Sequence, residues 1–437
     1  MTPRLRFAVL ASALVVATAV VPGCLGEDIA PASDTPTTSG DGGADATPAE
    51  GSDAGGGGGS DAAGPTCPTG FADCDEDATN GCETDIRSNA AHCGACKHAC
   101  GGAATCTAGA CQVEQIQSGL TKSYGLEVAG PRLLWFEPAM IRGCRADGCN
   151  TSTAIMVDVN ATLTPVTSAP HQMVLDGAGN FYFSQCPSAA SDCAIAQCPV
   201  TGCKLNGATY LVQPNGLRRP TSYGAGIGVV YTFQGIDRGF KWDIAGKTAT
   251  PLGYMMADST AEMWSDATRF AYLDPTTSLA NPQGGVYVCP LAGCASRSTL
   301  VPPPVKHLAI ANDVFYTTSP ATSPALNFGN SSVISCSLGG CGGDGKVLAK
   351  NQAFVGDVTA DDKEVFWTTL GAANPDVNTS AIGTVMKCKL PDCAGGPTKL
   401  ADAVVNPVAV RVDKDYVYWI TYGSGGAANG AIYRLRR

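Results

Sequence analysis

The sequence lacks the residue patterns of the common hydrolytic enzymes. It contains four histidines, and the motifs His-Glu-x-x-His, Gly-x-Ser-x-Gly and Gly-x4-Gly-Lys-Ser/Thr do not occur. We therefore predict no catalytic residues. The alternative is a lyase or hydrolase that acts on a polysaccharide or small molecule, with His171 or His307 as the acid–base group.

Positive charge is also scarce. The chain has 28 Lys and Arg against 38 Asp and Glu, so its formal net charge is −10. A protein with this excess of negative charge does not attract phosphate backbones, and we expect no nucleic-acid partner.

No apolar run in the sequence is long enough to span a bilayer comfortably. Residues 7–21 form a short apolar run behind Arg4 and Arg6, which is typical of a signal peptide. The next residues, Val21-Pro22-Gly23-Cys24, resemble the lipobox of bacterial lipoproteins, whose cysteine is lipidated. The alternative is an ordinary signal peptide with an incidental cysteine.

Lipidation of Cys24 would hold the protein on a membrane, since each buried CH₂ of an acyl chain contributes about 0.8 kcal/mol. By analogy with lipoprotein sorting, Leu25 in place of an aspartate favours the outer membrane or cell surface. From residue 24 to 66 large apolar side chains are almost absent, while Gly, Ala, Ser, Thr, Pro and Asp dominate. Such a segment cannot bury enough surface to fold, so we predict a flexible acidic linker.

Residues 67–111 hold eight cysteines and few aliphatic side chains. A segment this small without a core needs covalent cross-links, and four disulfides are the simplest arrangement in an exported chain. Spacing alone does not fix their connectivity. Zinc is the alternative, because His92 and His98 flank Cys93-x-x-Cys96.

Carboxylates alternate at the start of this module, at Asp73, Asp75 and Asp77. The pattern resembles the start of a calcium loop, but Ala78 stands where an EF-hand needs glycine. We expect solvated acidic residues and no cofactor, with calcium as the alternative. The module, from Asp73-Cys74-Asp75 to Asn80-Gly81-Cys82-Glu83, is similar to one that recurs in exported bacterial surface lipoproteins, often ahead of a β-propeller. That resemblance implies an extracellular setting.

A repeat organises the rest of the chain. Seven short apolar runs end in an aromatic residue, and the intervals between these aromatics are 41 to 52 residues, the length of a four-stranded propeller blade. The aromatics are Trp135, Phe183, Tyr231, Tyr272, Tyr316, Trp367 and Trp419. We predict an all-β fold in which residues 112–437 form a seven-bladed β-propeller.

The final repeat ends after three expected strands, whereas residues 113–120 form an additional strand ahead of the first repeat. We predict that this additional strand completes the last blade.

Pairs of cysteines recur in the propeller region with four residues between them. Cysteines flanking so short a hairpin can face each other at the separation that a disulfide needs. The pairs are Cys144/Cys149, Cys198/Cys203, Cys289/Cys294, Cys336/Cys341 and Cys388/Cys393, and Cys186/Cys193 lie in one loop. With eight cysteines in the module, this leaves Cys24 alone among 21.

Polar loops between the second and third strands of the blades would share one rim, and binding residues concentrate on such loops. The candidates are Asp274, Asn281, Asn330, Asn374, Asp376, Asn378, Tyr422 and Asn429. We therefore expect a monomeric, membrane-tethered propeller that binds a protein or glycan ligand without catalysis.

Overall fold

The computed structural model describes most of the chain after residue 66. The described residues are 67–77, 79–100, 104–137, 140–149, 154–158, 173–176, 178–185, 194–203, 209–212, 217–223, 228–233, 236–243, 245–254, 263–265, 268–274, 285–293, 298–301, 305–311, 313–318, 331–337, 345–371, 382–424 and 428–437. All of them belong to a compact unit, Ala63–Arg437. Cys24 and the predicted signal peptide and linker lie outside them. Among these residues, no helix is long and apolar enough to cross a membrane.

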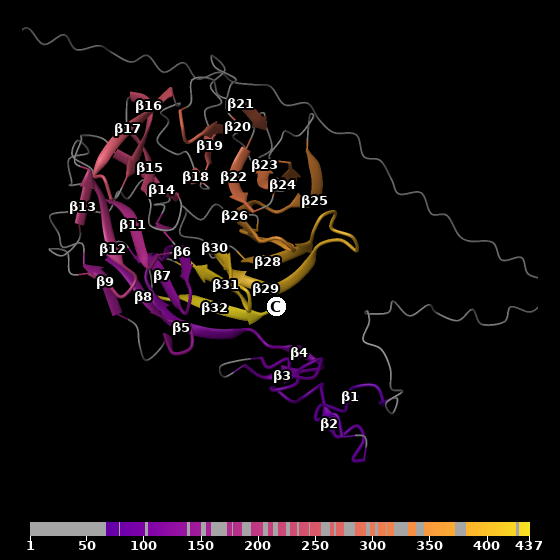
Figure 1. Cartoon of the computed structure of the whole chain (residues 1–437). Coiled ribbons are helices and arrows are strands. Elements are labelled where there is room, and N and C mark those ends of the chain that lie inside the picture. The colour runs from indigo at the N-terminus through magenta and orange to yellow at the C-terminus, as the bar shows by residue number, and fades with distance from the viewer. Residues whose placement is uncertain are drawn as a thin grey trace, which may run out of the picture. The chain divides into compact units, whose positions relative to one another are not determined.

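The elements of the described residues are all strands, which confirms the all-β prediction (Figure 1). They include seven antiparallel sheets of four strands. The first four sheets contain β6 (Tyr124–Ala129), β7 (Arg132–Glu137), β8 (Met140–Arg145) and β9 (Ala154–Asp158); β10 (Val174–Leu175), β11 (Asn180–Gln185), β12 (Ala194–Pro199) and β13 (Thr209–Val212); β14 (Leu217–Tyr223), β15 (Gly228–Phe233), β16 (Ile236–Asp243) and β17 (Thr248–Tyr254); and β18 (Met263–Ser265), β19 (Arg269–Asp274), β20 (Gly285–Pro290) and β21 (Ser298–Val301).

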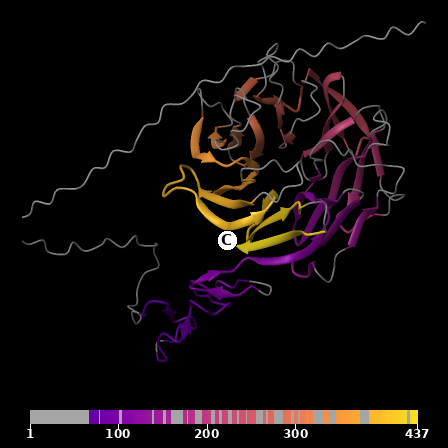
Figure 2. The same cartoon turned by 180° about the vertical axis from the view of Figure 1, so that it is seen from behind.

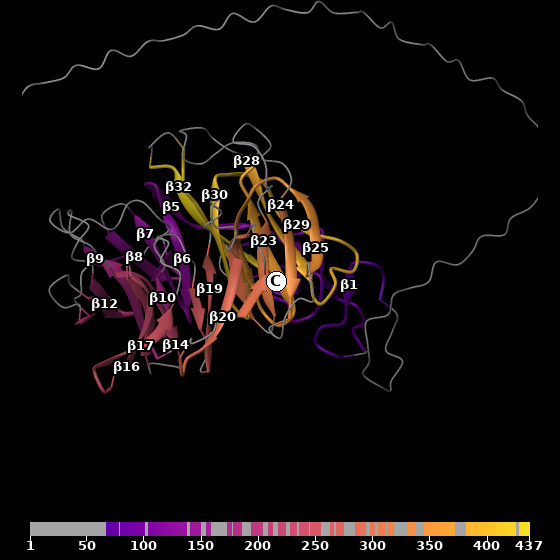
Figure 3. The ribbon, with the colours of Figure 1, turned by 90° about the horizontal axis from the view of Figure 1, so that it is seen from above.

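The other three sheets have the same order of strands. They contain β22 (Val305–Ile310), β23 (Val314–Thr318), β24 (Ser331–Cys336) and β25 (Lys346–Gln352); β26 (Val355–Ala360), β27 (Glu364–Thr369), β28 (Ile382–Lys389) and β29 (Thr398–Val405); and β30 (Pro407–Val412), β31 (Tyr416–Thr421), β32 (Gly430–Arg436) and β5 (Glu114–Leu120). The first strands of successive sheets are in contact from β6 to β30, and β30 contacts β6 (Figures 1 and 3).

The second strands are apolar on both faces because each is covered by two neighbouring sheets. Successive side chains of a strand point to opposite faces. In β7, Trp135 packs in one cluster with Ile420 and Ile432 of the last sheet. Leu134, the residue before Trp135, packs in another cluster with Phe181 of the second sheet. The apolar runs are therefore the layers between adjacent sheets.

The recurring aromatics lie on the second strand of each sheet, β7, β11, β15, β19, β23, β27 and β31. Five of them are buried: Trp135, Phe183, Tyr272, Trp367 and Trp419. The side chains of Tyr231 and Tyr316 lie outside the description. Burying a large aromatic side chain contributes about 1.5–3 kcal/mol, so the repeat marks the main packing positions between sheets.

The extra strand ahead of the first repeat pairs with the last strand of the chain, as predicted. Figure 2 shows the two strands side by side, β5 in purple and β32 in yellow. In their antiparallel register, Leu120 faces Gly430 and Gln117 faces Ile432. Arg434 of β32 binds Glu114 of β5 at 2.8 Å. The last sheet is thus built from two distant parts of the chain.

The cysteine-rich module is a disulfide knot with two short hairpins, β1 (Phe71–Ala72) with β2 (Thr84–Asp85) and β3 (Cys106–Thr107) with β4 (Ala110–Cys111). Its four disulfides are Cys67–Cys82, Cys74–Cys96, Cys93–Cys106 and Cys100–Cys111. All eight cysteines are paired in this way.

Three of the predicted hairpin disulfides are present, Cys144–Cys149, Cys198–Cys203 and Cys388–Cys393. Cys289 and Cys336 are also disulfide-bonded. Cys186, Cys193, Cys294 and Cys341 lie outside the described residues.

Candidate functional site

A cavity of about 400 Å³ lies among the first strands of the sheets. Strands β6, β18, β22, β26 and β30 contribute to its wall, and we call it the central cavity. Its polar and aromatic lining residues are Tyr124, Glu127, Trp264, His307, Asp357 and Arg411. Small and aliphatic residues such as Gly125, Ala309 and Val408 line the rest. This size and mixed lining are those of a small-molecule site.

Three charged side chains from three different sheets meet at this cavity. Arg411 of β30 binds Glu127 Oε1 of β6 through Nη2 at 3.0 Å and through Nε at 3.1 Å. Its Nη1 binds Asp357 Oδ2 of β26 at 2.7 Å. The same Asp357 oxygen accepts the main-chain N–H of Val410 at 2.9 Å. We call these three residues the Arg411 triad.

Burial and charge have opposite effects on the triad. Burial raises the pKa of the Glu127 carboxyl, and the adjacent Arg411 only partly offsets this effect. Burial also disfavours the charged guanidinium of Arg411, but the attraction of Glu127 and Asp357 outweighs it and raises the Arg411 pKa. With both carboxylates ionised, the triad carries one net negative charge.

Tyr124 connects the cavity to the predicted rim. Its ring stacks on Phe136 with 5.6 Å between centroids. Burial raises the pKa of Tyr124 to about 12, and the nearby Tyr422 is a smaller cause of the same shift. Tyr422, a candidate rim residue, therefore lies close to a residue of the cavity wall.

Two of the other rim candidates, Asn429 and Asp274, lie among the described residues. Asn429 closes its own loop, because its Oδ1 accepts the Ser424 N–H at 2.7 Å and its Nδ2 donates to Ser424 Oγ at 2.8 Å. Asp274 ends β19, where it pairs with Gly285. Asn281, Asn330, Asn374, Asp376, Asn378 and His171 lie outside the described residues, whereas His307 lines the central cavity.

Sequence reasoning missed the Arg411 triad. Its signal was a charged residue inside an otherwise apolar first strand, as in Val408-Ala409-Val410-Arg411-Val412. A first strand that lines a central cavity places alternate side chains toward it, so a charge there is a candidate for binding.

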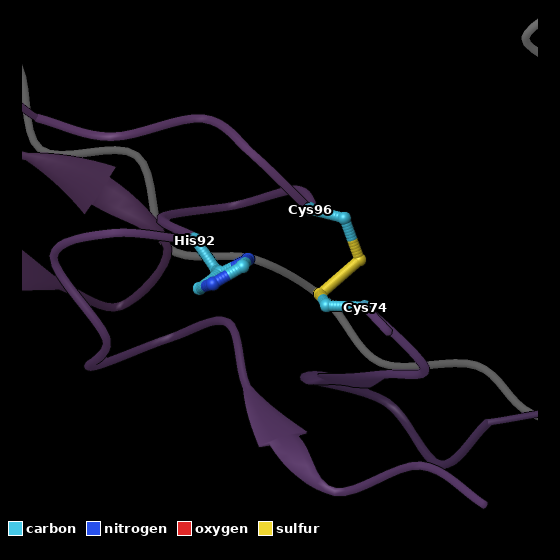
Figure 4. Close-up of side chains that lie close together, drawn as sticks. All are labelled: Cys74, His92 and Cys96. Atoms are coloured by element: carbon cyan, nitrogen blue, oxygen red, sulfur yellow. A yellow bond between two sulfur atoms is a disulfide. The ribbon is translucent and has the colours of Figure 1, made fainter. Parts of the chain in front are cut away.

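The cysteine-rich module brings together three groups of metal-ligating residue types. One of them consists of Cys93, Cys100 and Cys111, whose sulfurs are all in disulfides. The two other groups contain a histidine or carboxylates. In the first, His92 lies beside Cys74 and Cys96 (Figure 4). Both sulfurs are in one disulfide, and His92 Nδ1 accepts the Lys97 N–H at 3.1 Å. Cysteine binds zinc as a thiolate, and with both sulfurs in a disulfide only His92 of this group is left as a ligand, so the group does not fit zinc.

The second group contains Asp73, Asp75 and Glu83, whose carboxylate oxygens lie within 4.8 Å of one another. Asp77, which belongs to the alternating pattern, is not in this group. Its Oδ1 accepts a hydrogen bond from the Thr79 hydroxyl at 2.6 Å. Desolvation raises the pKa of Asp73, and the Asp75 and Glu83 carboxylates add to this effect. Asp73 is half-buried, whereas Asp75 and Glu83 are exposed. Asp73 accepts the Glu76 N–H at 2.8 Å and Asp75 the Asp77 N–H at 3.1 Å, so both hold a turn of the module in place.

No family model matches the sequence, and no curated protein matches it. Solved structures with a similar fold include the β-propeller domain of the Trilobed protease from Pyrococcus furiosus, described as having an open velcro topology (7% identity, 73% of this chain and 94% of that one, TM-score 0.49). Others are the RRP9 WD40 repeats (8%, 74% and 97%, 0.48) and a streptogramin B lyase (12%, 75% and 98%, 0.47).

A further similar structure is the tricorn protease, of which this chain spans about a third (9% identity, 74% of this chain and 34% of that one, TM-score 0.47). At such identities the likeness concerns the fold alone. The chain is an all-β protein with a disulfide-rich N-terminal module, and its structural neighbours are β-propellers.

Proposed function

We propose that the chain is a seven-bladed β-propeller that binds a protein or glycan ligand at its central cavity without catalysis. The Arg411 triad carries this proposal, because it places fixed charges from three sheets on one cavity wall. Binding sites typically combine an apolar wall with a few such groups. The proposed blades are the seven four-stranded sheets, with β5 as the closing strand.

The arrangement of the carboxylates favours binding over catalysis. A general acid and a general base need different protonation states and access to the reacting atoms. Glu127 and Asp357 instead share one guanidinium, which holds both in fixed positions. A catalytic role would require one of them to leave Arg411.

The second candidate is a lyase or hydrolase that acts on a polysaccharide or small molecule. The observation in its favour is that His307 lines the same cavity as Glu127 and Asp357. A histidine and a carboxylate in one cavity are the minimum set for proton transfer.

A glycan and peptide array screened with the full chain carrying Cys24→Ser tests both candidates. We expect ligands that the unsubstituted cavity binds and that the Arg411→Met variant loses, with no product after prolonged incubation. Turnover of a bound ligand that Glu127→Gln or His307→Gln abolishes would favour the enzyme. Binding that Arg411→Met leaves unchanged would contradict the proposed site.

We further propose that residues 1–23 are a lipoprotein signal peptide and that residues 24–66 are a flexible linker from the lipidated Cys24. Residues 67–111 would then be a separate cysteine-rich module ahead of the propeller at 112–437. Lipidation leaves the other 20 of the 21 cysteines available for ten pairs. The protein would be a monomer displayed at the outer membrane or cell surface.

A further inference from the structure

Toward the described residues, each carboxylate of the Arg411 triad uses only one of its two oxygens. Glu127 Oε1 accepts two bonds from Arg411, and Asp357 Oδ2 accepts from Arg411 and from the Val410 N–H. Within the described part of the chain, no hydrogen bond reaches Glu127 Oε2 or Asp357 Oδ1, and both side chains are partly exposed. Each side chain therefore has one acceptor oxygen to offer to a ligand.

The position and charge of these oxygens favour a positively charged donor. Both side chains line the central cavity, where Glu127 is 21% and Asp357 17% exposed. They approach Arg411 from β6 and β26, on opposite sides of β30. Because two carboxylates face one guanidinium, a single additional positive charge would neutralise the site. Hydrogen bonds that involve a charged group contribute about 1.5–3 kcal/mol each.

Two aromatic side chains on the rest of the wall suit a ligand that carries a positive charge. Tyr124 and Trp264 line the same cavity as the triad and present aromatic surface. An aromatic ring attracts a nearby cation through its π face. A cavity of about 400 Å³ is large enough for a sugar unit but small for a folded protein surface.

We infer that the central cavity recognises a protonated amino sugar of a glycan, whose ammonium group binds Glu127 Oε2 and Asp357 Oδ1. This inference rests on the proposed binding function and names its ligand class. Arg411 then acts as a positioning residue, because it binds one oxygen of each carboxylate. No covalent step is involved.

Titration calorimetry with three β-1,4-linked trimers tests the ligand class on the full chain carrying Cys24→Ser. One trimer is built from glucosamine, one from N-acetylglucosamine and one from glucose. The three therefore differ only in the group at one carbon of each sugar unit. We expect the glucosamine trimer to bind at least about tenfold more tightly than the other two, as one charge-assisted hydrogen bond predicts. Its affinity should fall as salt is raised, because salt screens the charges.

Substitutions then test which side chains bind the ammonium group. Glu127→Gln and Asp357→Asn keep the shape of each side chain and should each cost the glucosamine trimer about tenfold in affinity. Both should leave any weak binding of the glucose trimer unchanged. Asp402→Asn is the matched control, because Asp402 is an exposed carboxylate that binds Lys399 of β29.

Equal affinity for the three trimers would overturn the inference and leave the glycan-binding function in place. A preference for glucosamine that persists in both Glu127→Gln and Asp357→Asn would also overturn it, because recognition would then lie elsewhere. Failure of all three trimers to bind would overturn it as well, and the array would then decide the proposed function separately. The comparison of trimers needs no variant to fold.

Discussion

The residue that starts the second strand of several sheets is positioned by an aspartate. Asp176, Asp361 and Asp413 each accept two main-chain N–H groups of the turn that follows the first strand. Asp413 and Asp176 also accept the hydroxyl of a buried tyrosine, Tyr418 and Tyr182. Short side chains that bond their own turn are the common means of fixing a hairpin.

Asp413→Ala should destabilise the protein. The change leaves the N–H groups of Asp415 and Tyr416 and the buried Tyr418 hydroxyl without their acceptor, at a cost of about 1–3 kcal/mol. Chemical denaturation measures this loss. Asp402→Ala on β29 removes an exposed ion pair with Lys399 and an exposed hydrogen bond from the Ala403 N–H, so it should cost less than Asp413→Ala. Equal losses would contradict the role of the turn.

Two of these aspartates should make the fold sensitive to acid. Burial disfavours the charged form of Asp176, but hydrogen bonds from Asn180, Tyr182 and Ala178 outweigh it and lower its pKa below 3.8. Burial likewise opposes the ionisation of Asp361, while Arg437 and two main-chain N–H groups lower its pKa.

Because both pKa values are lowered on folding, their contribution to stability is complete above pH of about 4, the unfolded value. It is lost as pH falls through the lowered values. Melting temperatures measured from pH 5 downward should therefore fall steeply below pH 4, and Asp176→Asn should reduce that slope. An unchanged slope in the variant would show that Asp176 does not contribute.

At the scale of elements, β5 is the strand that the last sheet requires. Ile116 and Leu120 are buried in the cluster that also holds Trp135 and Ile420. Burying two such side chains contributes about 3–6 kcal/mol. The strand therefore links the packing of the first and last sheets.

Deletion of residues 112–120 should lower the melting temperature by many degrees, because it removes this packing and leaves β32 with an open edge. Thermal unfolding followed by circular dichroism measures the effect. Deletion of residues 52–60, an equal length within the predicted linker, serves as the control and should change nothing. If both deletions melted alike, β5 would not be a closing strand.

The strands could be predicted from sequence because their signal is local and repeated. An aromatic such as Trp367 after two apolar residues recurs on the second strand of each sheet, and cysteines five apart mark a hairpin. The Arg411 triad could not be predicted in this way. Its members lie 54 and 284 positions apart along the chain and meet only when three sheets are placed side by side. The disulfide connectivity of the module could not be predicted either, because its cysteines pair across 11 to 22 positions of the chain.

At the scale of the whole molecule, the proposed anchor makes a prediction about location. In a bacterial host that processes lipoproteins, the unsubstituted chain should sediment with membranes. Cys24→Ser should move it to the soluble fraction, because two or more acyl chains are needed for stable anchoring.

Membrane fractionation followed by immunoblotting measures this distribution. Leu25→Asp keeps the cysteine and, by the sorting analogy, should move the protein from the outer to the inner membrane. A Cys24→Ser protein that still sediments with membranes would show that another part of the chain holds it there.

The pairing of β5 with β32 also constrains the order in which the protein can fold during its synthesis. Glu114 and Arg434 are 320 positions apart, so β5 leaves the ribosome long before its partner exists. Until β32 has been synthesised, the edge of β5 is unpaired. The first sheet then also lacks the neighbouring sheet that covers one of its faces. Contacts of such long sequence separation form slowly, so joining the two ends is expected to be the last and slowest step of folding.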